Sequence, residues 1–258
     1  MIRFLLVVLS VGGFLVFFSW LLYLQRRLGR TDRRRMEEES LVIVQRVFRM
    51  VLRIAGTKVT VRGLENIPKD QAVLYVGNHR SYFDILVGYT TVPTLMGFVA
   101  KKEMRRYPLL AQWMENVNCL FLDRKNPKEG LKTILSGIAQ VKRGVSVWIF
   151  PEGTRNRSED PLELMEFKEG SLKIAEKAGC PVIPVAITGT ADVFEKHLPF
   201  IYPAHVTVEY GKPFMIQELE PDQRKFSGAY TRALIIEMLK AEKERREAER
   251  ERETAAQV

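Results

Sequence analysis

The feature that most constrains the fold is a regular alternation of short β-branched runs with helical stretches, which begins at Thr57. The runs that predict strands are TKVTVRG, AVLYVG, TLMGFVA, CLFLD, VSVWIF, PVIPVAIT and HVTVEYG. The stretches that predict helices are approximately residues 83–89, 108–116, 127–142, 168–177 and 223–244. Such alternation indicates an α/β fold, with a mostly parallel or mixed sheet covered by helices. In sheets of this kind, functional sites gather at strand ends, where loops leave the core.

We predict three parts along the chain of 258 residues. Residues 1–56 are expected to form N-terminal membrane-anchoring helices, and residues 57–240 the α/β domain. Residues 241–258 contain the sequence EKERREAERERE, in which charges of both signs alternate without an apolar face. This charged tail is expected to be a solvated helix extension or a frayed end.

The first part contains an uncharged run from Phe4 to Leu24, which is long enough to cross a bilayer as one helix. A signal peptide would have a shorter apolar core, more charge before it and a small-residue cleavage site after it. Here the following sequence, QRRLGRTDRRR, holds six arginines. The positive-inside rule therefore predicts a cell-membrane protein whose later residues lie on the cytoplasmic side. A buried core helix is the alternative, and the sequence leaves open whether the segment spans the bilayer or re-enters it.

A second apolar stretch, SLVIVQRVFRMVLRIAG, carries three arginines on one helical face, Arg46, Arg49 and Arg53. This pattern suits a helix that lies in the membrane interface with its arginines among lipid phosphates. It also suits a domain helix whose arginines face water. Both interpretations remain open at this stage.

The formal net charge of +9 favours an anionic partner. The arginines cluster beside an apolar span, and no nucleic-acid motif accompanies them, so membrane lipids are expected and nucleic acid is not. Only two cysteines occur, Cys119 and Cys180, and their spacing is not that of a metal site or a disulfide framework. A reduced compartment is the simpler interpretation.

The stretch VGNHRSYFDILVGY places His79 and Asp84 between an apolar run and a helical one. Residues five apart on an ideal helix point about 140° away from each other. The two side chains can therefore meet only if His79 lies in the loop and Asp84 in the first helical turn. Ser81 and Asp84 also have the form of a capping box, so helix capping and catalysis are both open. A metal site is poorly supported, and Ser81 as a nucleophile is the less favoured role.

Cationic side chains follow three other predicted strands. Glu152 and Arg155 lie in the turn after WIF, Arg124 follows CLFLD, and Lys101 follows TLMGFVA. Arginine suits two-point binding of a phosphate. Together with the His/Asp pair, these residues predict a site for an anionic substrate beside a general base. Pro184 interrupts a further apolar run and predicts a sheet edge or a bulge.

These residues match four ordered motifs of a known family. Asn-His-x-x-x-x-Asp is present as residues 78–84, a strand ending in arginine as residues 121–124, Phe-Pro-Glu-Gly-Thr-Arg as residues 150–155, and an apolar run around a proline as residues 182–185. The chain thus resembles the glycerolipid acyltransferases, and most closely the bacterial 1-acyl-glycerol-3-phosphate acyltransferases, over roughly residues 57–215. One departure from the family pattern is Asn118-Cys119, where many members have glycine and a small or apolar residue.

The resemblance implies a direct acyl transfer to the sn-2 hydroxyl of lysophosphatidic acid, which gives phosphatidic acid. His79 would be the general base and Asp84 its orienting partner. Lys101, Arg124 and Arg155 would bind the substrate phosphate, and backbone amides near the His79 loop would stabilise the oxyanion. Supporting motif positions are Asn78, Glu152, Gly153, Thr154 and Pro184. Glu152 would hold the arginines or the acceptor glycerol.

The resemblance also implies a donor, which is a thioester of acyl carrier protein or of CoA, and neither metal nor cofactor. The acyl chain length, the choice between the two donors and the oligomeric state stay open. Two alternatives remain: the same chemistry on another acceptor, such as glycerol-3-phosphate, another lysophospholipid or a lyso-aminolipid, and a non-catalytic membrane scaffold.

Overall fold

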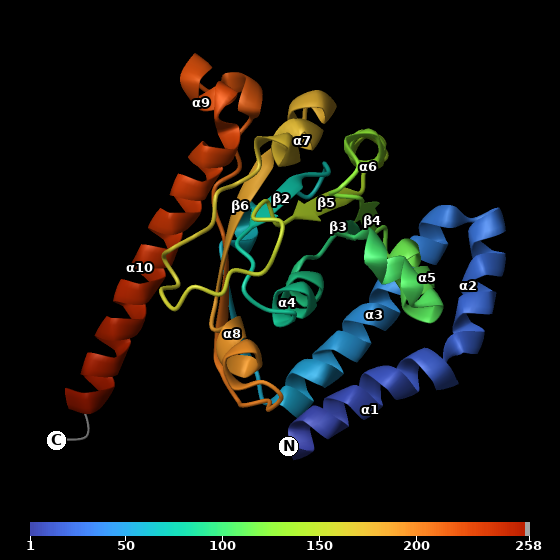
Figure 1. The fold of residues 1–258 in the computed structure, drawn as a ribbon, viewed down its shortest axis with the longest axis horizontal. Coiled ribbons are helices and arrows are strands. Elements are labelled where there is room, and N and C mark those ends of the chain that lie inside the picture. The colour runs from blue at the N-terminus through green and yellow to red at the C-terminus, as the bar shows by residue number, and fades with distance from the viewer. Residues whose placement is uncertain (256–258) are drawn as a thin grey trace.

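The computed structural model describes residues 1–255 and contains one sheet of seven strands in the order β1-β7-β6-β2-β5-β3-β4 (Figure 1). The strands are β1 Lys58–Arg62, β2 Leu74–Gly77, β3 Met96–Lys101, β4 Leu120–Leu122, β5 Ser146–Ile149, β6 Val182–Thr188 and β7 His205–Tyr210. Six strands fall within the runs that predicted them, and β3 extends one residue beyond its run, to Lys101, which was expected to follow the strand. The α/β prediction with a mixed sheet is confirmed.

Strand direction decides where a site can form. The five strands β6, β2, β5, β3 and β4 are parallel to one another, whereas β7 is antiparallel to β6 and parallel to β1. The carboxyl ends of five strands therefore meet at one edge of the sheet. The loops with the first and third motifs leave the sheet at this edge, and Arg124 of the second motif follows β4 there, whereas the fourth motif lies within β6.

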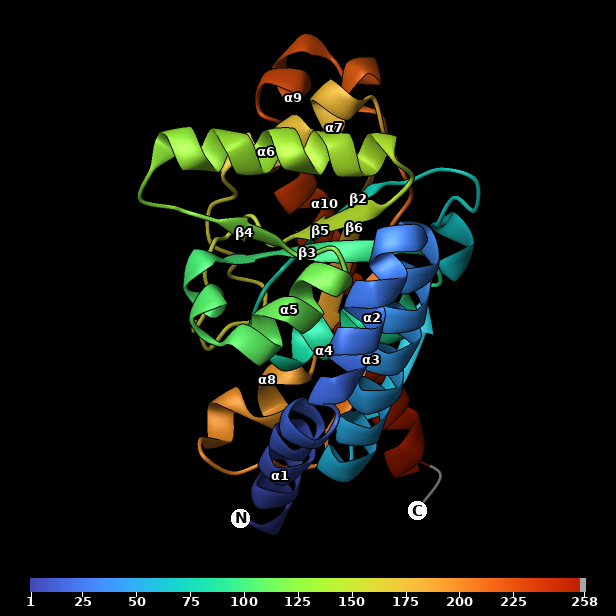
Figure 2. The ribbon, with the colours of Figure 1, turned by 90° about the vertical axis from the view of Figure 1, so that its right-hand side faces the viewer.

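Helices cover both faces of the sheet. They are α4 Phe83–Thr91, α5 Pro108–Asn116, α6 Pro127–Lys142, α7 Lys173–Ala178, α8 Thr190–Val193, α9 Pro221–Lys225 and α10 Ser227–Ala255. Figure 2 shows α6 and α7 on one side of the sheet and α4 and α5 on the other. The helix predicted over 168–177 is a short 3-10 turn followed by α7, and the helix predicted over 223–244 lies mostly within α10.

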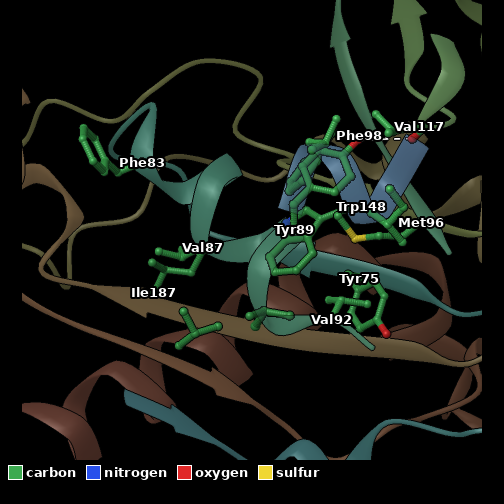
Figure 3. Close-up of a cluster of buried hydrophobic side chains, with 14 of the residues drawn as sticks. Tyr75, Phe83, Val87, Tyr89, Val92, Met96, Phe98, Val117, Trp148 and Ile187 are labelled. Carbon is green, nitrogen blue, oxygen red and sulfur yellow. Dashed lines mark hydrogen bonds between the residues drawn. The ribbon is translucent and has the colours of Figure 1, made fainter. Parts of the chain in front are cut away.

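Side-chain alternation along the strands builds two hydrophobic cores. Leu74 and Val76 of β2 point into the core under α6, α7 and α10, while Tyr75 points into the core under α3, α4 and α5. Trp148 of β5 lies beside Tyr75, with ring centroids 5.3 Å apart (Figure 3). Because helices cover both faces of the sheet, the sequences of these strands are apolar at consecutive positions.

Pro184 lies in β6, which is a central strand and not a sheet edge. The edge alternative is therefore wrong. The chain advances three positions from Val182 to Val185 but four from Tyr210 to Phe214 on the facing segment. The extra residue is a bulge, as the other alternative predicted, and it accommodates a proline that cannot donate to the ladder.

The N-terminal run is not one helix. It forms α1 Ile2–Phe17 and α2 Ser19–Thr31, which bend by 52° at Phe18, and α3 Arg33–Ala55 follows. Within residues 1–255, no single helix is apolar and long enough to cross a membrane; α1 and α2 meet that test only as a bent pair. The prediction of one spanning helix is therefore corrected to a broken pair.

Helix α3 is packed on the domain. Leu41, Val44 and Leu52 are buried, and α3 contacts α4 along its length. Its three arginines at 46, 49 and 53 are exposed. This agrees with the alternative in which α3 is a domain helix whose arginines face water.

The boundary predicted at residue 240 falls inside α10, which continues to Ala255. Glu242 is only 3% exposed, and its carboxylate receives hydrogen bonds from Arg245 and Arg246. Arg246 also reaches Thr188 and Thr207 at the end of the sheet. The first turns of the predicted tail therefore belong to the domain.

Candidate active site

The loop after β2 brings His79 and Asp84 together. Nδ1 of His79 lies 2.8 Å from Oδ2 of Asp84, and the Asp84 side chain is almost completely buried. A carboxylate can only accept, so Nδ1 carries the proton and Nε2 is the basic nitrogen. The His79 ring is 15% exposed and stacks on Phe150, with centroids 4.2 Å apart. The pair thus has the orientation of a general base with a fixed partner.

The start of α4 explains how Asp84 is held. Its Oδ2 accepts backbone hydrogen bonds from Arg80 at 2.7 Å and Ser81 at 2.8 Å, and Oγ of Ser81 accepts one from Phe83 at 2.9 Å. The N-cap residue of α4 is Tyr82 and not Ser81, so the capping box is not formed as predicted, but these bonds still satisfy the amides that precede the helix. The same carboxylate oxygen of Asp84 therefore accepts the amides that precede the helix and pairs with His79. Ser81 is fully buried with its oxygen engaged, which removes it as a nucleophile.

The amides of this loop are all committed to other partners. The N–H of His79 goes to Glu152, those of Arg80 and Ser81 go to Asp84, that of Tyr82 goes to Glu195, and that of Phe83 goes to Ser81. None is left to bind an oxyanion. The oxyanion donors expected near the His79 loop are therefore not the amides of residues 79–83.

Glu152 has a different role from the one expected. Its Oε1 accepts the His79 N–H at 2.7 Å and its Oε2 accepts the Met165 N–H at 3.1 Å, and the residue is 3% exposed. The Glu152 carboxylate therefore accepts hydrogen bonds from backbone amides, and it does not hold the arginines or face an open site for the acceptor. Burial raises the pKa of the Glu152 carboxyl, and the two backbone hydrogen bonds oppose that rise.

Asn78 ties the catalytic loop to the neighbouring strand. Its amide donates to the Ile187 carbonyl at 2.9 Å and accepts the Ile187 N–H at 2.8 Å. Asn156, just after the Phe-Pro-Glu-Gly-Thr-Arg turn, donates its N–H to the His79 carbonyl at 2.7 Å. The His79 loop is therefore fixed from β6 on one side and from the turn after β5 on the other.

Arg155 is engaged by residues from two other strand ends. It donates to Glu195 Oε1 at 2.9 Å and to the Tyr82 hydroxyl at 3.1 Å, and its guanidinium lies 3.7 Å from the centroid of the Tyr82 ring. Glu195 Oε1 also accepts the Tyr82 N–H at 2.8 Å. The charge of Arg155 is thus balanced by a carboxylate.

The other two predicted cations are more accessible. Arg124 is exposed and donates to the carbonyl of Gly153, which adopts a left-handed backbone with φ of 74°. Lys101 is exposed at the end of β3, and Thr154 is exposed in the turn. Arg124 therefore lies against the same turn that carries Arg155, whereas Lys101 is placed only on the same edge of the sheet.

Two further observations bear on expected chemistry. Among the residues that the structure describes, no group of three or more His, Cys, Asp or Glu could hold a metal ion. Asn118 has a positive φ of 61°, which is a conformation that glycine and asparagine adopt readily. The departure at Asn118 therefore keeps the backbone geometry that a glycine would allow.

The arrangement is that of a known protein family. The family model described as "Acyltransferase" matches residues 58–188, which include the His79 loop, the turn after β5 and β6. The chain belongs to the acyltransferase family. The match covers the five parallel strands and the edge at which their loops meet.

Proteins named 1-acyl-sn-glycerol-3-phosphate acyltransferase are similar in sequence. The one from Salmonella typhimurium is 30% identical over 206 residues, which cover 80% of this chain and 82% of that protein. The one from Cocos nucifera is 32% identical over 74% of this chain, and the one from Borreliella burgdorferi is 32% identical over 62%. The matched regions cover only 61% and 63% of those two proteins.

A solved structure has the same architecture. The crystal structure of the 1-acyl-sn-glycerophosphate (LPA) acyltransferase PlsC from Thermotoga maritima superimposes with a TM-score of 0.75 at 29% identity. The alignment covers 93% of this chain and 97% of that one. The similarity therefore extends beyond the four motifs to nearly the whole acyltransferase chain.

Sequence reasoning missed two residues of the site, Glu195 and Tyr82, and one contact, that of Phe150 with His79. Glu195 is 40 positions from Arg155, and no motif marks it. Tyr82 lies inside the first motif at a position that the pattern leaves free. The ring of Phe150, the first residue of the third motif, was not expected to pack on His79. Only the position of Phe150 at a strand end beside the turn of the third motif could have indicated this contact.

Proposed function

We propose that this protein transfers a fatty acyl group from acyl-ACP or acyl-CoA to the sn-2 hydroxyl of 1-acyl-glycerol-3-phosphate, giving phosphatidic acid for phospholipid synthesis. The observation that carries this proposal is the 2.8 Å contact between His79 and Asp84, which directs the basic Nε2 away from its partner. The similar proteins named 1-acyl-sn-glycerol-3-phosphate acyltransferase support this choice of acceptor. The proposed chemistry requires neither a metal nor a cofactor.

The proposed reaction has two bond changes at one carbon. Nε2 of His79 takes the hydroxyl proton while the acceptor oxygen attacks the thioester carbonyl, and the Asp84 carboxylate stabilises the imidazolium. Collapse of the tetrahedral intermediate breaks the carbon–sulfur bond, and the leaving thiolate takes the proton back from Nε2. The products are an ester and a free thiol, with no acylated enzyme residue. A positioned base contributes about 10²–10⁴ in rate.

The phosphate of the acceptor is proposed to bind at Lys101, Arg124 and Arg155. Arg124 and Lys101 offer exposed charge at the edge where His79 lies. Arg155 is balanced by Glu195, but a guanidinium carries five N–H donors and only two hydrogen bonds engage it here. Its remaining donors are available to an anion.

A place on the cytoplasmic side of the cell membrane follows as part of the proposal. Leu5, Leu9 and Phe17 of α1 are 51%, 68% and 78% exposed, and they continue into the exposed rings of Trp20 and Tyr23. An apolar surface of this kind is unfavourable in water and favourable against lipid tails, with the aromatic rings at the interface. The acceptor and the product would reside in the same bilayer.

Mass spectrometry of the products from a panel of donors and acceptors tests this proposal. The expected product is phosphatidic acid, formed only with a thioester donor and released with an equivalent of free thiol. If the acyl group goes instead to glycerol-3-phosphate, another lysophospholipid or a lyso-aminolipid, the proposed chemistry stands and the proposed acceptor is wrong. Absence of thiol release with every acceptor, in folded protein with vesicles, would leave the membrane scaffold as the function.

A further inference from the structure

A cleft lies between α2, α3 and α5, apart from the loops that carry His79. Its volume is about 360 Å³. The arginines Arg26, Arg30 and Arg33 line it, together with the amides of Gln25 and Gln112. Figure 2 shows α2 in front of α3 and beside α5. Arginines and amides around one open cleft are the donor set of an anion site.

The acidic residues of the cleft are already balanced. Glu37 is 1% exposed, and both of its oxygens lie 2.8 Å from Arg143, while Arg33 donates to Oε1 at 2.9 Å. Glu115 faces Arg105 at 3.6 Å. The charge that remains at the cleft is therefore positive.

Two lining groups lack a complete set of partners. The guanidinium of Arg30 forms no hydrogen bond or ion pair with any group that the structure describes. Gln25 is 5% exposed, and its Oε1 is buried without a hydrogen-bond partner while its Nε2 donates to Glu39 at 3.3 Å. A buried orphan oxygen costs about 1–3 kcal/mol, which a hydroxyl on a bound group would relieve.

The N-terminal hairpin consists of α1 and α2, which pack against α3. The order of residues along it indicates where the anion comes from. Exposed apolar side chains at Val16 and Phe17 are followed by the exposed rings of Trp20 and Tyr23, and then by Arg30. Apolar side chains in the lipid tails, aromatic rings at the interface and arginines among the phosphates follow one another in this order at a membrane surface. We propose that this cleft binds the phosphate headgroup of an anionic phospholipid.

The test compares two arginine variants of the full chain on vesicles. Vesicles of phosphatidylcholine alone and of phosphatidylcholine with phosphatidylglycerol are used, and bound protein is measured by co-sedimentation. Arg30→Gln is expected to weaken binding to the anionic vesicles about fivefold and to leave binding to neutral vesicles unchanged. Far-UV circular dichroism checks that each variant is folded.

Arg34→Gln is the matched control. Arg34 is exposed on α3, pairs with Glu38 at 2.7 Å and does not line the cleft, yet its replacement removes the same charge. Its binding is expected to stay within about twofold of the unmodified protein. Equal losses in the two variants would mean diffuse attraction to the surface and would overturn the proposal.

Inorganic phosphate distinguishes a lipid headgroup from a free ion. At matched ionic strength, phosphate is expected to compete with anionic vesicles for the unmodified protein and not for Arg30→Gln. Phosphate binding to the cleft without any gain from phosphatidylglycerol would overturn the lipid assignment. None of these measurements involves acyl transfer, so they succeed or fail independently of the proposed function.

Discussion

The strand-end loops bury their polar groups and pair them within the chain, whereas the N-terminal hairpin leaves apolar and cationic side chains exposed. In the loops, every amide from His79 to Phe83 has an internal partner, and Asp84 and Glu152 are buried among donors. In the hairpin, Phe17 and Trp20 are exposed and the guanidinium of Arg30 lacks a partner among the described residues.

The loops thus form their hydrogen bonds within the chain, whereas the exposed side chains of the hairpin depend on the surroundings of the protein for partners. The hydrogen bonds around Asp84 Oδ2 and Glu152 hold the proposed base in one orientation before any substrate arrives, which is the preorganisation that catalysis requires. Unpartnered apolar surface and arginines gain free energy only from an external phase. The following predictions test each side of this contrast, from the largest expected effect to the smallest.

Replacement of His79 by alanine is expected to have the largest effect, because it removes the only proposed base. His79→Ala should lower kcat by about 10²–10⁴ with little change in the melting temperature. The measurement is thiol release with lysophosphatidate, alongside thermal unfolding. His205→Ala, which removes an exposed imidazole from β7, is the matched control and should retain activity. Equal rates for the two variants would contradict a base at residue 79.

Replacement of Arg124 tests the exposed cations beside the site. Loss of a charge-assisted hydrogen bond of about 1.5–3 kcal/mol predicts that Arg124→Gln raises KM for lysophosphatidate roughly ten- to a hundredfold. The same variant should not change KM for a 1-acylglycerol that lacks the phosphate. Lys125→Gln, at the adjacent exposed position, is the control. Equal losses with both acceptors would remove Arg124 from the phosphate site.

Replacement of Glu152 tests whether the buried network supports the fold. A glutamine would turn an N–H group toward the amide of His79 or Met165, so Glu152→Gln should lower the free energy of unfolding by about 1–3 kcal/mol. Urea unfolding measures this value. Glu159→Gln, an exposed position on the following loop, should change it by no more than about 0.5 kcal/mol.

The raised pKa of Glu152 also predicts a pH dependence. Between the unfolded value, about 4.3, and the higher folded pKa, the folded protein holds a proton that the unfolded chain has released. The free energy of unfolding should therefore fall as the pH rises through this window. In Glu152→Gln this part of the slope should disappear. An identical slope in both proteins would place the titration elsewhere.

The strands and the contact between His79 and Asp84 could be predicted because their signals are local. Apolar runs such as the one that ends at Val76 are short and bounded by turns, and the helix-start geometry of Ser81 and Asp84 follows from five consecutive residues. Two helices, Pro108–Asn116 and Pro127–Lys142, have the bounds predicted, since each begins at a proline. Local chemistry decides such features.

The remaining features depend on tertiary contacts. No proline or charged residue marks the break between α1 and α2 at Phe18. Glu195 contacts Arg155 only because β5, β2 and β6 are neighbours in the sheet. Glu152 was expected to meet arginines because the sequence places Arg155 nearby. The fold instead buries Glu152 beside the His79 amide.

The most direct test of the contrast compares two forms of the acceptor. Leu5→Ser, Leu9→Ser and Phe17→Ser are combined in one variant, because all three side chains are exposed on α1. Its activity is measured on lysophosphatidate embedded in vesicles and on a short-chain, water-soluble analogue. Our account predicts normal turnover of the soluble acceptor and reduced turnover of the embedded one. Equal losses on both acceptors, in a protein with an unchanged melting temperature, would contradict the separation between a self-sufficient site and a membrane-dependent hairpin.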